Sequence, residues 1–382
     1  MAHRQVDSRL RRGGRGLTGF PDVAVVGGGI VGCAAAAFLA EAGARVEVFE
    51  RDEVAAAASG RNSGSIQHPF DRVLSELHAE TLRHYRELEG FELPERPAGV
   101  LMLARDRRPL ESARAEIARL WPELRPALVG GRDLRRLEPG LARELWACRL
   151  ETGYPVRPAA ATLAFAARAP RAGALLHEGR AAWPWVRSGQ IRGVFAGHER
   201  CAAGSVLVAA GPWTPEVIDP TRAWSPIEPV WGVVVEVRLA NPPRHVLEEA
   251  GVEDVAAGAA GSLFSLVSSA GVVSLGSTFL AEEPDPRAWA TTLREAGAVF
   301  VPALRDAEVV RARACARPQS LDGRPLVGPV GEVEGLWVAA GHGPWGISAG
   351  PATGRLAADA ILGRGRIPAS LAASRASATY AR

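Results

Sequence analysis

The chain has 382 residues, 47% of them hydrophobic, and a formal net charge of +3 at neutral pH. It is long enough for two domains that each bury a core, and its charge is too small to indicate binding to nucleic acid or to an acidic membrane. All 45 basic residues are arginine, which excludes enzymes that need a lysine Schiff base, such as those that use pyridoxal phosphate.

Residues 1–20 are rich in arginine and glycine and lack the apolar segment of a signal peptide. We predict a disordered basic tail here; an anchor to an anionic surface is the alternative, and only the charge favours it. No apolar run in the chain is long enough to span a membrane. The four cysteines show neither CxxC spacing nor a disulfide framework, so we expect a reducing, cytoplasmic location.

The stretch at residues 23–51, VAVVGGGIVGCAAAAFLAEAGARVEVFER, is typical of a nucleotide-binding βαβ unit. Val23–Val26 is a short apolar run that we expect to form a buried parallel strand. Residues 34–40 are small and favour a helix, and residues 45–49 are the expected second strand, which ends at Glu50. Strand, helix, second strand and acid occur in the order that a dinucleotide-binding fold requires.

Gly27, Gly29 and Gly32 form a GxGxxG motif within this unit. The first glycine permits the tight turn, the second lets the backbone approach a pyrophosphate, and the third allows close packing of helix and strand. The N-terminus of the helix then offers unpaired N–H groups to the phosphates. Glu50 is expected to accept hydrogen bonds from the adenosine ribose, and an acid here disfavours NADP. The motif alone leaves FAD and NAD open.

Three further segments favour FAD. Residues 58–64, ASGRNSG, are typical of a loop that wraps closely around a cofactor, and residues 205–213, SVLVAAGPW, contain a strand that runs into a glycine turn. Residues 336–340 and 347–362 are predicted as a strand and a helix on either side of the glycine turn GHGPWG. Two strand–glycine–helix units, more than 300 residues apart, indicate a long cofactor with two polar ends.

These motifs, with ETGYPVRP, PVWG, SLGST and RPQSLDGRPLVGP, resemble those of the D-amino-acid-oxidase-like family of FAD-dependent oxidoreductases, from residue 22 to about 363. The similarity is to its glycine-oxidase-like and sarcosine-oxidase-like members. The resemblance implies an α/β plus α+β fold, in which a Rossmann-like FAD-binding domain has a parallel sheet of the glutathione reductase type and a substrate-binding cap domain has an antiparallel sheet.

The same resemblance implies domains that are discontinuous in sequence. The predicted ranges are 20–92, 153–220 and 315–365 for the FAD-binding domain, 93–152 and 221–314 for the substrate-binding domain, and 366–382 for a C-terminal tail. The residues agree in part, because 111–120 and 132–142 have the pattern of amphipathic helices. The segments VWGVVVEVRL, LFSLVSS and VVSLGSTF alternate like strands of an antiparallel sheet.

By the resemblance, FAD lies extended, with its pyrophosphate at the first helix and its isoalloxazine at the last glycine turn. The motifs and the resemblance together assign the following residues to FAD: Gly27, Gly29, Ile30, Val31, Gly32, Glu50, Arg51, Ser59, Arg61, Asn62, Ser63, Gly64, Ala210, Gly211, Trp213, Cys315, Gly341, Gly343, Pro344, Trp345, Gly346 and Ile347.

Family members oxidise a C–N bond in an amino acid or N-methyl amine by hydride transfer to flavin N5, and the resulting imine hydrolyses. The resemblance therefore implies an FAD-dependent amino acid or amine oxidoreductase, with oxygen or another electron acceptor as its second partner. Sarcosine-oxidase-like members activate oxygen with a lysine, which this chain lacks, so oxidase and dehydrogenase both stay open. Oxidation of an α-hydroxy acid, or a flavin-binding subunit of a larger complex, are the alternatives. The oligomeric state is not indicated.

Three residues are the candidates for the catalytic site. Arg317 matches the arginine that grips the substrate carboxylate in glycine-oxidase-like members, and its planar fork suits a carboxylate; the alternative is an ordinary ion pair. His342 either stabilises the reduced flavin as a neutral or cationic donor or caps the strand end through the backbone. Trp345 either narrows the substrate site or packs as an interface or lid residue.

Cys315 stands seven residues before Asp322, at the point where sarcosine-oxidase-like members carry a cysteine joined covalently to the flavin. Thiolate attack needs a lowered thiol pKa, which Arg313 and Arg317 are placed to provide. The remainder of the motif instead resembles glycine-oxidase-like members, whose FAD is not covalent. A cysteine packed under the flavin as a small apolar residue is the commoner outcome.

Overall fold

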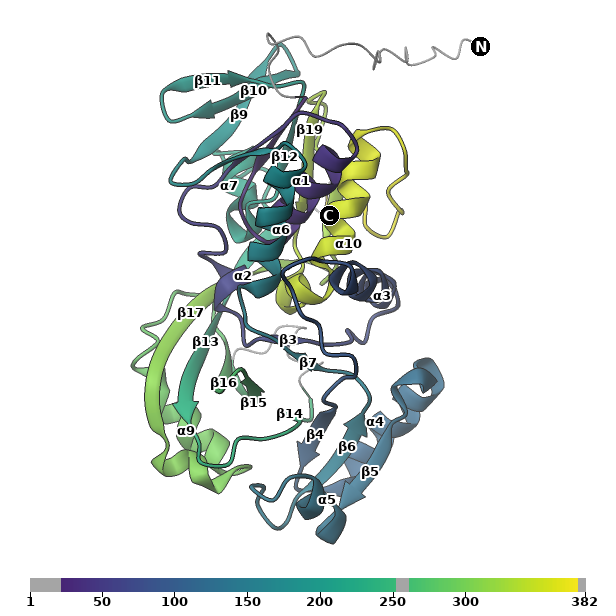
Figure 1. Cartoon of the computed structure of the whole chain (residues 1–382), viewed down its shortest axis with the longest axis vertical. Coiled ribbons are helices and arrows are strands. Elements are labelled where there is room, and N and C mark those ends of the chain that lie inside the picture. The colour runs from purple at the N-terminus through teal and green to yellow at the C-terminus, as the bar shows by residue number, and fades with distance from the viewer. Residues whose placement is uncertain (1–21, 252–260, 377–382) are drawn as a thin grey trace.

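The computed structural model describes residues 22–251 and 261–376. The predicted basic tail at residues 1–20 lies outside this part of the chain. Figure 1 shows two lobes, one built on a six-stranded sheet and the other on an eight-stranded sheet, with the chain passing between them several times.

The six-stranded sheet has its first strand, β1, near its centre. Its order is β18 (Leu326–Pro329), β19 (Leu336–Ala340), β12 (Ser205–Val208), β1 (Val23–Val26), β2 (Val46–Phe49) and β8 (Leu175–His177). All neighbouring pairs are parallel except β18 and β19. The predicted strands at 23–26 and 336–340 have these bounds, and the predicted strand at 45–49 begins one residue later.

Both faces of this sheet are covered, which explains why β1 is apolar at every position. On one face lie the helices α1 (Ile30–Glu41), α6 (Ala160–Arg171) and α10 (Gly346–Ile361), against which Val23 and Val25 pack. On the other face lies a three-stranded sheet of β9 (Ala182–Arg187), β10 (Gln190–Ala196) and β11 (Glu199–Ala202), against which Ala24 and Val26 pack. No sequence motif predicted this second layer.

Helices α1 and α10 approach each other closely because small residues line their contact. Residues 34–37, the four alanines that follow Cys33, have no exposed surface. A side chain at Gly354 on α10 would place its Cβ only 2.8 Å from the backbone nitrogen of Ala35. Helix α3 (Arg72–Arg86) packs on the other side of α10 and begins with Asp71, whose carboxylate accepts hydrogen bonds from the amides of Val73 and Leu74.

The eight-stranded sheet forms the second lobe. Its order is β17 (Glu308–Ser320), β13 (Ile227–Arg238), β16 (Val272–Phe279), β15 (Gly261–Ser269), β14 (Val246–Glu249), β4 (Val100–Ala104), β6 (Trp146–Leu150) and β5 (Ala127–Gly130). Every pair is antiparallel except β14 and β4, which are parallel. The antiparallel cap was predicted, but this parallel pair was not.

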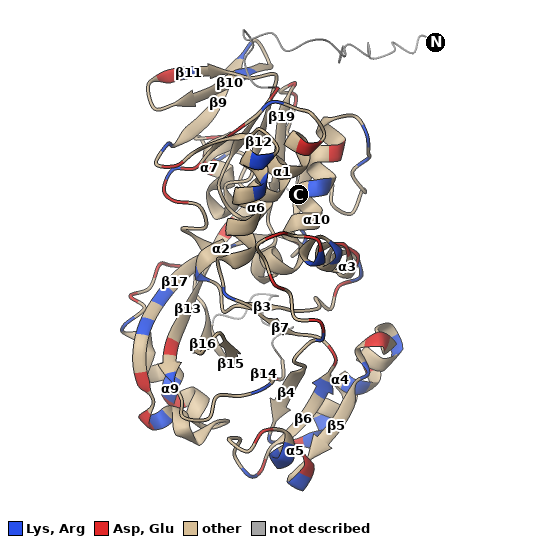
Figure 2. Cartoon of the chain, in the orientation of Figure 1, with Lys and Arg blue, Asp and Glu red and all other residues tan. Residues whose placement is uncertain are grey.

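We call this eight-stranded sheet the cap sheet. It is covered by the helices α4 (Arg107–Leu120), α5 (Gly131–Leu137) and α9 (Trp289–Ala298). The helix predicted at 132–142 is shorter than expected and ends at Leu137. Figure 2 shows acidic and basic residues interspersed along β17 and around α9. None of the helices in the described residues is both long and apolar enough to cross a bilayer.

Two of the predicted domain boundaries lie next to or within segments that the structure shows to be continuous or packed. The boundary at residues 314 and 315 falls inside the continuous strand β17, so this strand carries cap residues and predicted FAD-binding residues together. Residues 366–376, predicted as part of a C-terminal tail, are packed rather than free. Leu371 is buried, and the backbones of Leu371 and Ala373 exchange hydrogen bonds with Val327 on β18. Residues 377–382 lie outside the described part of the chain.

Candidate active site

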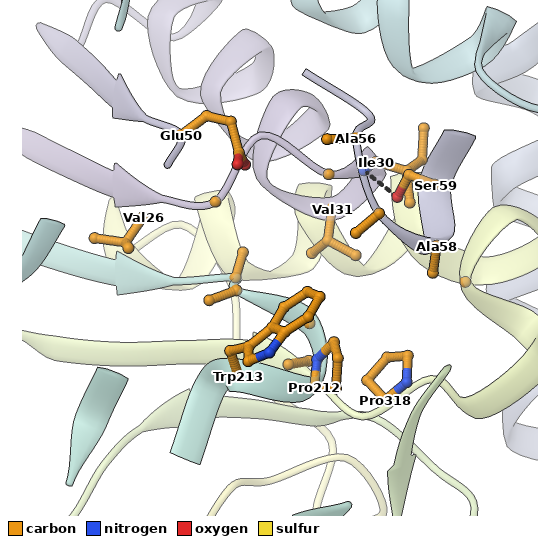
Figure 3. A pocket seen from close by; sticks show the side chains of 18 of the residues that line it. Val26, Ile30, Val31, Glu50, Ala56, Ala58, Ser59, Pro212, Trp213 and Pro318 are labelled. Carbon is orange, nitrogen blue, oxygen red and sulfur yellow. Dashed lines mark hydrogen bonds between the residues drawn. The ribbon is translucent and has the colours of Figure 1, made fainter. Parts of the chain in front are cut away.

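A cavity of about 270 Å³ lies where β1, β12 and β19 end and β17 reaches the six-stranded lobe. Its walls come from the turn before α1, the end of β2 and the loop after it, and α2 (Ala58–Arg61). The other side is formed by η2 (Gly211–Trp213), β17, η4 (Gly343–Trp345) and the start of α10. Figure 3 shows α1 and Glu50 on one side of this cavity, with Trp213, Pro212 and Pro318 opposite.

The glycine turn before α1 has the geometry that its sequence predicted. Gly27 has a φ of +117°, and a Cβ there would lie 2.4 Å from the carbonyl oxygen of Ala209. A Cβ at Gly32 would lie 2.0 Å from the carbonyl oxygen of Gly27, so Gly32 serves packing beneath the turn and does not line the cavity. Gly29 faces the cavity, at the N-terminus of α1.

Glu50 lies at the end of β2 and is held by two backbone amides. Its Oε2 accepts a hydrogen bond from the amide of Gly28 at 2.6 Å, and its Oε1 accepts one from the amide of Asp52 at 2.9 Å. A carboxylate oxygen has two lone pairs, so each oxygen can still accept a second hydrogen bond. The fixed carboxylate is therefore ready to accept hydroxyl donors from a ribose in the cavity.

The loop at residues 58–64 is organised by two side chains. Ser59 Oγ accepts a hydrogen bond from the amide of Ile30 at 3.0 Å, which ties the loop to the first turn of α1 (Figure 3). Asn62 donates from Nδ2 to the carbonyls of Ala58 and Ser59 and accepts at Oδ1 from the amide of Gly64. Ser59 and Asn62 line the cavity, whereas Arg61, Ser63 and Gly64 do not.

The glycine turn before α10 forms the opposite end of the cavity. Gly343 has a φ of +53°, and a Cβ there would lie 2.5 Å from Oε1 of Gln319. His342 is buried, and its Nε2 lies 2.9 Å from Oγ1 of Thr353. Because that hydroxyl donates to the carbonyl of Ala349, it accepts from His342, which places the ring proton on Nε2. Burial lowers the pKa of His342 to about 4, so the neutral form is the relevant one at pH 7.

Trp345 does not line the cavity. Its indole packs against the apolar core beneath α10, and its amide donates to the carbonyl of His342 at 3.0 Å. Trp345 is therefore not a wall residue of this cavity. Gly341 is also absent from the lining; it has a φ of +96°, and a Cβ there would lie 3.1 Å from Cβ of Ser320.

Arg317 projects from β17 into the cavity wall, and its guanidinium is tightly seated. It donates from Nη1 to the carbonyl oxygen of Thr278 at 2.9 Å and from Nη2 to the hydroxyl of Ser277, and it lies 4.5 Å from the ring centre of Phe279. No carboxylate in the described residues forms an ion pair with it. Burial lowers the pKa of Arg317 from its usual value, but arginine remains a cation in proteins.

Cys315 also lines the cavity and is buried. Its thiol lies 3.7 Å from the carbonyl oxygen of Arg61. Burial raises the pKa of this thiol above its usual value, and this outweighs the opposing effect of Arg317 and Arg313. The expected lowering of the Cys315 pKa by its arginine neighbours is therefore wrong, since desolvation dominates.

The structure thus brings most of the predicted cofactor and catalytic residues to one cavity. Those on its wall are Gly27, Gly29, Ile30, Val31, Glu50, Arg51, Ser59, Asn62, Ala210, Gly211, Trp213, Cys315, Arg317, His342, Gly343, Pro344, Gly346 and Ile347. The lining suits FAD, because two glycine turns that each precede a helix lie at opposite ends and a fixed carboxylate stands beside the first.

Sequence reasoning missed part of the wall near Glu50. Trp183 on β9 lines the cavity and is 44% exposed. The guanidinium of Arg51 lies 3.9 Å from the ring centre of Trp213, so these two predicted residues stack on each other. The only sequence feature that marks Trp183 is the aromatic pair WPW, which has no periodicity or motif around it.

A model of the family described as DAO, FAD dependent oxidoreductase, matches residues 22–360. The chain belongs to this family of FAD-dependent oxidoreductases. The family, the FAD cofactor and the oxidoreductase class predicted from the sequence are thereby confirmed.

Glycine oxidases are among the relatives of this family member. The chain is 28% identical over 377 residues to glycine oxidase of Pseudomonas aeruginosa, covering 90% of this chain and 95% of the relative. It is 30% identical over 370 residues to that of Geobacillus kaustophilus, covering 89% and 92%. The solved structure of the Geobacillus kaustophilus glycine oxidase superposes with a TM-score of 0.79, at 25% identity, over 93% of this chain and 98% of that one. The predicted fold class is confirmed.

Proposed function

We propose that this enzyme oxidises the C–N bond of a small amino acid, or of an N-substituted amino acid, whose carboxylate binds Arg317. The observation that carries the proposal is a cation on the cavity wall that no carboxylate of the described residues neutralises. A buried charge is costly unless a counter-charge reaches it. A substrate carboxylate supplies that counter-charge and matches the planar fork of arginine.

The relatives support this reaction class, since they include glycine oxidases and a D-amino acid dehydrogenase of Rhizobium johnstonii that is 27% identical over 309 residues, or 69% of its length. They do not favour the two alternatives, oxidation of an α-hydroxy acid or a non-catalytic subunit. Bound FAD supplies a two-electron acceptor for the reaction. Oxygen or another acceptor must then remove the electrons, and the names of the relatives include oxidases and a dehydrogenase.

In this proposal the chain's own residues bind and orient. Glu50 and the turn at Gly27–Gly29 would hold the adenosine and pyrophosphate end of the cofactor. The wall residues Ser59, Asn62, Gly343, Pro344, Gly346 and Ile347 would hold the remainder. Arg317, on the cavity wall, would bind the substrate carboxylate and so orient the substrate in the cavity. His342, neutral and bonded to Thr353, acts as a polar wall residue without a charge. In this proposal the six-stranded lobe is the FAD-binding unit and the cap sheet is the substrate-binding unit. The predicted location of the enzyme is the cytoplasm.

The test is an anaerobic screen of the purified holoprotein, in which loss of the flavin absorbance reports oxidation of the added compound. Amino acids, N-methyl amino acids, the corresponding decarboxylated amines and α-hydroxy acids are compared. We expect bleaching by a carboxylate-bearing amine and none by its decarboxylated analogue. Bleaching by α-hydroxy acids alone would refute the amine reaction. Readmission of air, or addition of a quinone, then distinguishes an oxidase from a dehydrogenase.

Arg317→Lys tests the role of the guanidinium. A point charge does not reproduce the bidentate fork, so we expect KM to rise at least tenfold while FAD affinity is kept. Equal KM and kcat for Arg317→Ala and the wild type would remove Arg317 from the substrate site.

A further inference from the structure

A buried arginine near the cavity has a partner that the proposed reaction does not use. Arg313 lies on β17, and its side chain is 5% exposed. It forms an ion pair with Glu236 on the neighbouring strand β13, and its Nη2 lies 3.4 Å from the hydroxyl of Ser274 on β16. These three residues all belong to the cap sheet.

The same guanidinium also reaches the other lobe. Its Nε donates to the carbonyl oxygen of Arg61 at 3.0 Å, and its Nη2 donates to the carbonyl oxygen of Asn62 at 2.9 Å. Figure 1 shows α2, which ends at Arg61, against the end of β17. Arg313 therefore joins the cap sheet to the loop at residues 58–64, which is bonded to α1 through Ser59.

The donor set requires arginine at this position. Separate nitrogens of one planar group bond Glu236, Arg61 and Asn62, and a lysine has a single nitrogen from which to reach them. Glu236 keeps this cation compensated, because a buried charge without a partner is strongly unfavourable. Burial lowers the pKa of Arg313, and the nearby carboxylate of Glu236 opposes that shift.

Strands β13 and β17 do not need the buried Arg313–Glu236 ion pair in order to associate. Strands β13 and β17 are already hydrogen-bonded in register from Ile227 to Arg238, and a second pair on the same strands, Arg238 with Glu308, is exposed to solvent. Replacing a buried pair by apolar residues is often neutral or stabilising. What the buried pair adds is a fixed position for two carbonyl groups of the loop.

We propose that Arg313 and Glu236 are positioning residues that hold residues 58–64 in the conformation that binds the flavin half of FAD. By fixing the carbonyls of Arg61 and Asn62 away from the cavity, they leave Ser59 and Asn62 on its wall. The proposal rests on the FAD site described above. It concerns the half of the cofactor beyond the adenosine, because Glu50 and Gly28 are not among the contacts of Arg313.

The experiment compares the binding of FAD and of ADP to apoprotein. ADP reaches the Glu50 end of the cavity and the N-terminus of α1, where the loop is held by the bond of Ser59 to Ile30 and not by Arg313, whereas FAD spans both ends of the cavity. For Arg313→Lys, which keeps the charge but not the separate bonds, we expect the FAD Kd to rise about tenfold or more, since hydrogen bonds to charged groups are strong. We expect the ADP Kd to stay within about twofold of that of the wild type. The control, Arg238→Lys in the exposed pair on the same strands, should change neither Kd.

Two results would overturn the proposal. An unchanged FAD Kd for Arg313→Lys shows that the loop does not depend on the bonds from Arg313. An equal weakening of FAD and ADP shows that the pair only supports the fold. Glu236→Gln is the second variant, and it decides the matter if Arg313→Lys does not fold: we expect weaker FAD binding with ADP binding unchanged, and an unchanged FAD Kd contradicts the proposal. If the wild type itself binds no FAD, the proposed function fails instead.

Discussion

Gly232→Ala is expected to disable the carboxylate site without unfolding the protein. Gly232 lies on β13 directly beneath the guanidinium of Arg317. A Cβ at this position would lie 2.4 Å from Nη2, 2.6 Å from Cζ and 2.7 Å from Nη1 of Arg317. All three near atoms belong to the end of one flexible side chain, so the guanidinium will move and the backbone will not.

The size of the movement follows from these distances. Ordinary van der Waals contact begins at about 3.4 Å, so the guanidinium has to shift by about 1 Å. Such a shift draws it away from the carbonyl of Thr278 and the hydroxyl of Ser277, which fix its orientation. A misplacement of about 1 Å in a positioning group costs up to about 100-fold in rate, and we expect KM for a carboxylate-bearing substrate to rise roughly 10- to 100-fold.

The assay is steady-state kinetics with the substrate found in the anaerobic screen, together with a thermal melt. The Tm should stay close to that of the wild type. Alanine lowers the conformational entropy of the unfolded chain, which changes the free energy of unfolding by only about 0.4–1 kcal/mol. Gly140→Ala is the matched control, since a Cβ there meets no atom within 4 Å, and its KM should not change. A wild-type KM for Gly232→Ala would refute the assignment of Arg317 to the carboxylate.

Three further predictions concern the cofactor and the histidine. Glu50→Gln should weaken FAD binding by about tenfold in a titration of apoprotein. The NH₂ group of glutamine is a donor, so where it faces the amide of Gly28 the hydrogen bond is lost and two donors oppose each other. An unchanged FAD affinity contradicts this prediction. Acid precipitation should leave all yellow colour in the supernatant and the bare polypeptide mass, because burial raises the pKa of Cys315; a flavin adduct in the mass spectrum shows the opposite. The pKa of His342 is lowered to about 4 in the folded protein, whereas histidine in the unfolded chain has its usual pKa of about 6.5. Between these pH values the unfolded state binds more protons, so the free energy of unfolding should fall as the pH drops from 6.5 toward 4, by up to about 3 kcal/mol from this residue. The Tm of His342→Gln should fall less over that range, and an equal fall counts against the assignment.

The elements around the first glycine turn could be predicted because their signals are local. Each residue of Val23–Val26 is apolar since both faces of the sheet are covered, and the turn at Gly27 needs a positive φ. The same holds for Leu336–Ala340 and the turn at Gly343. In these segments a few consecutive residues carry the whole pattern.

The contacts around Arg317 and Arg313 could not be predicted in this way. Arg317 touches Gly232 only because β13 and β17 pair in one particular register, and Arg313 bonds Arg61 across 252 residues of sequence. Nothing near Trp183 marks it as a wall residue, because it reaches the cavity through the layer of β9–β11 that no motif announces. Burial likewise reversed the expected pKa shift of Cys315.

The order of the strands in the six-stranded sheet has a consequence for synthesis on the ribosome. The turn at Gly27 and the acid at Glu50 emerge before the opposite wall of the same cavity, which is built from residues 315–347. Strand β19 must also insert beside β12 before that wall exists. A nascent chain therefore carries one half of the cavity while the residues between Glu50 and residue 315 are made, and the complete cavity can form only after residue 347 has left the exit tunnel.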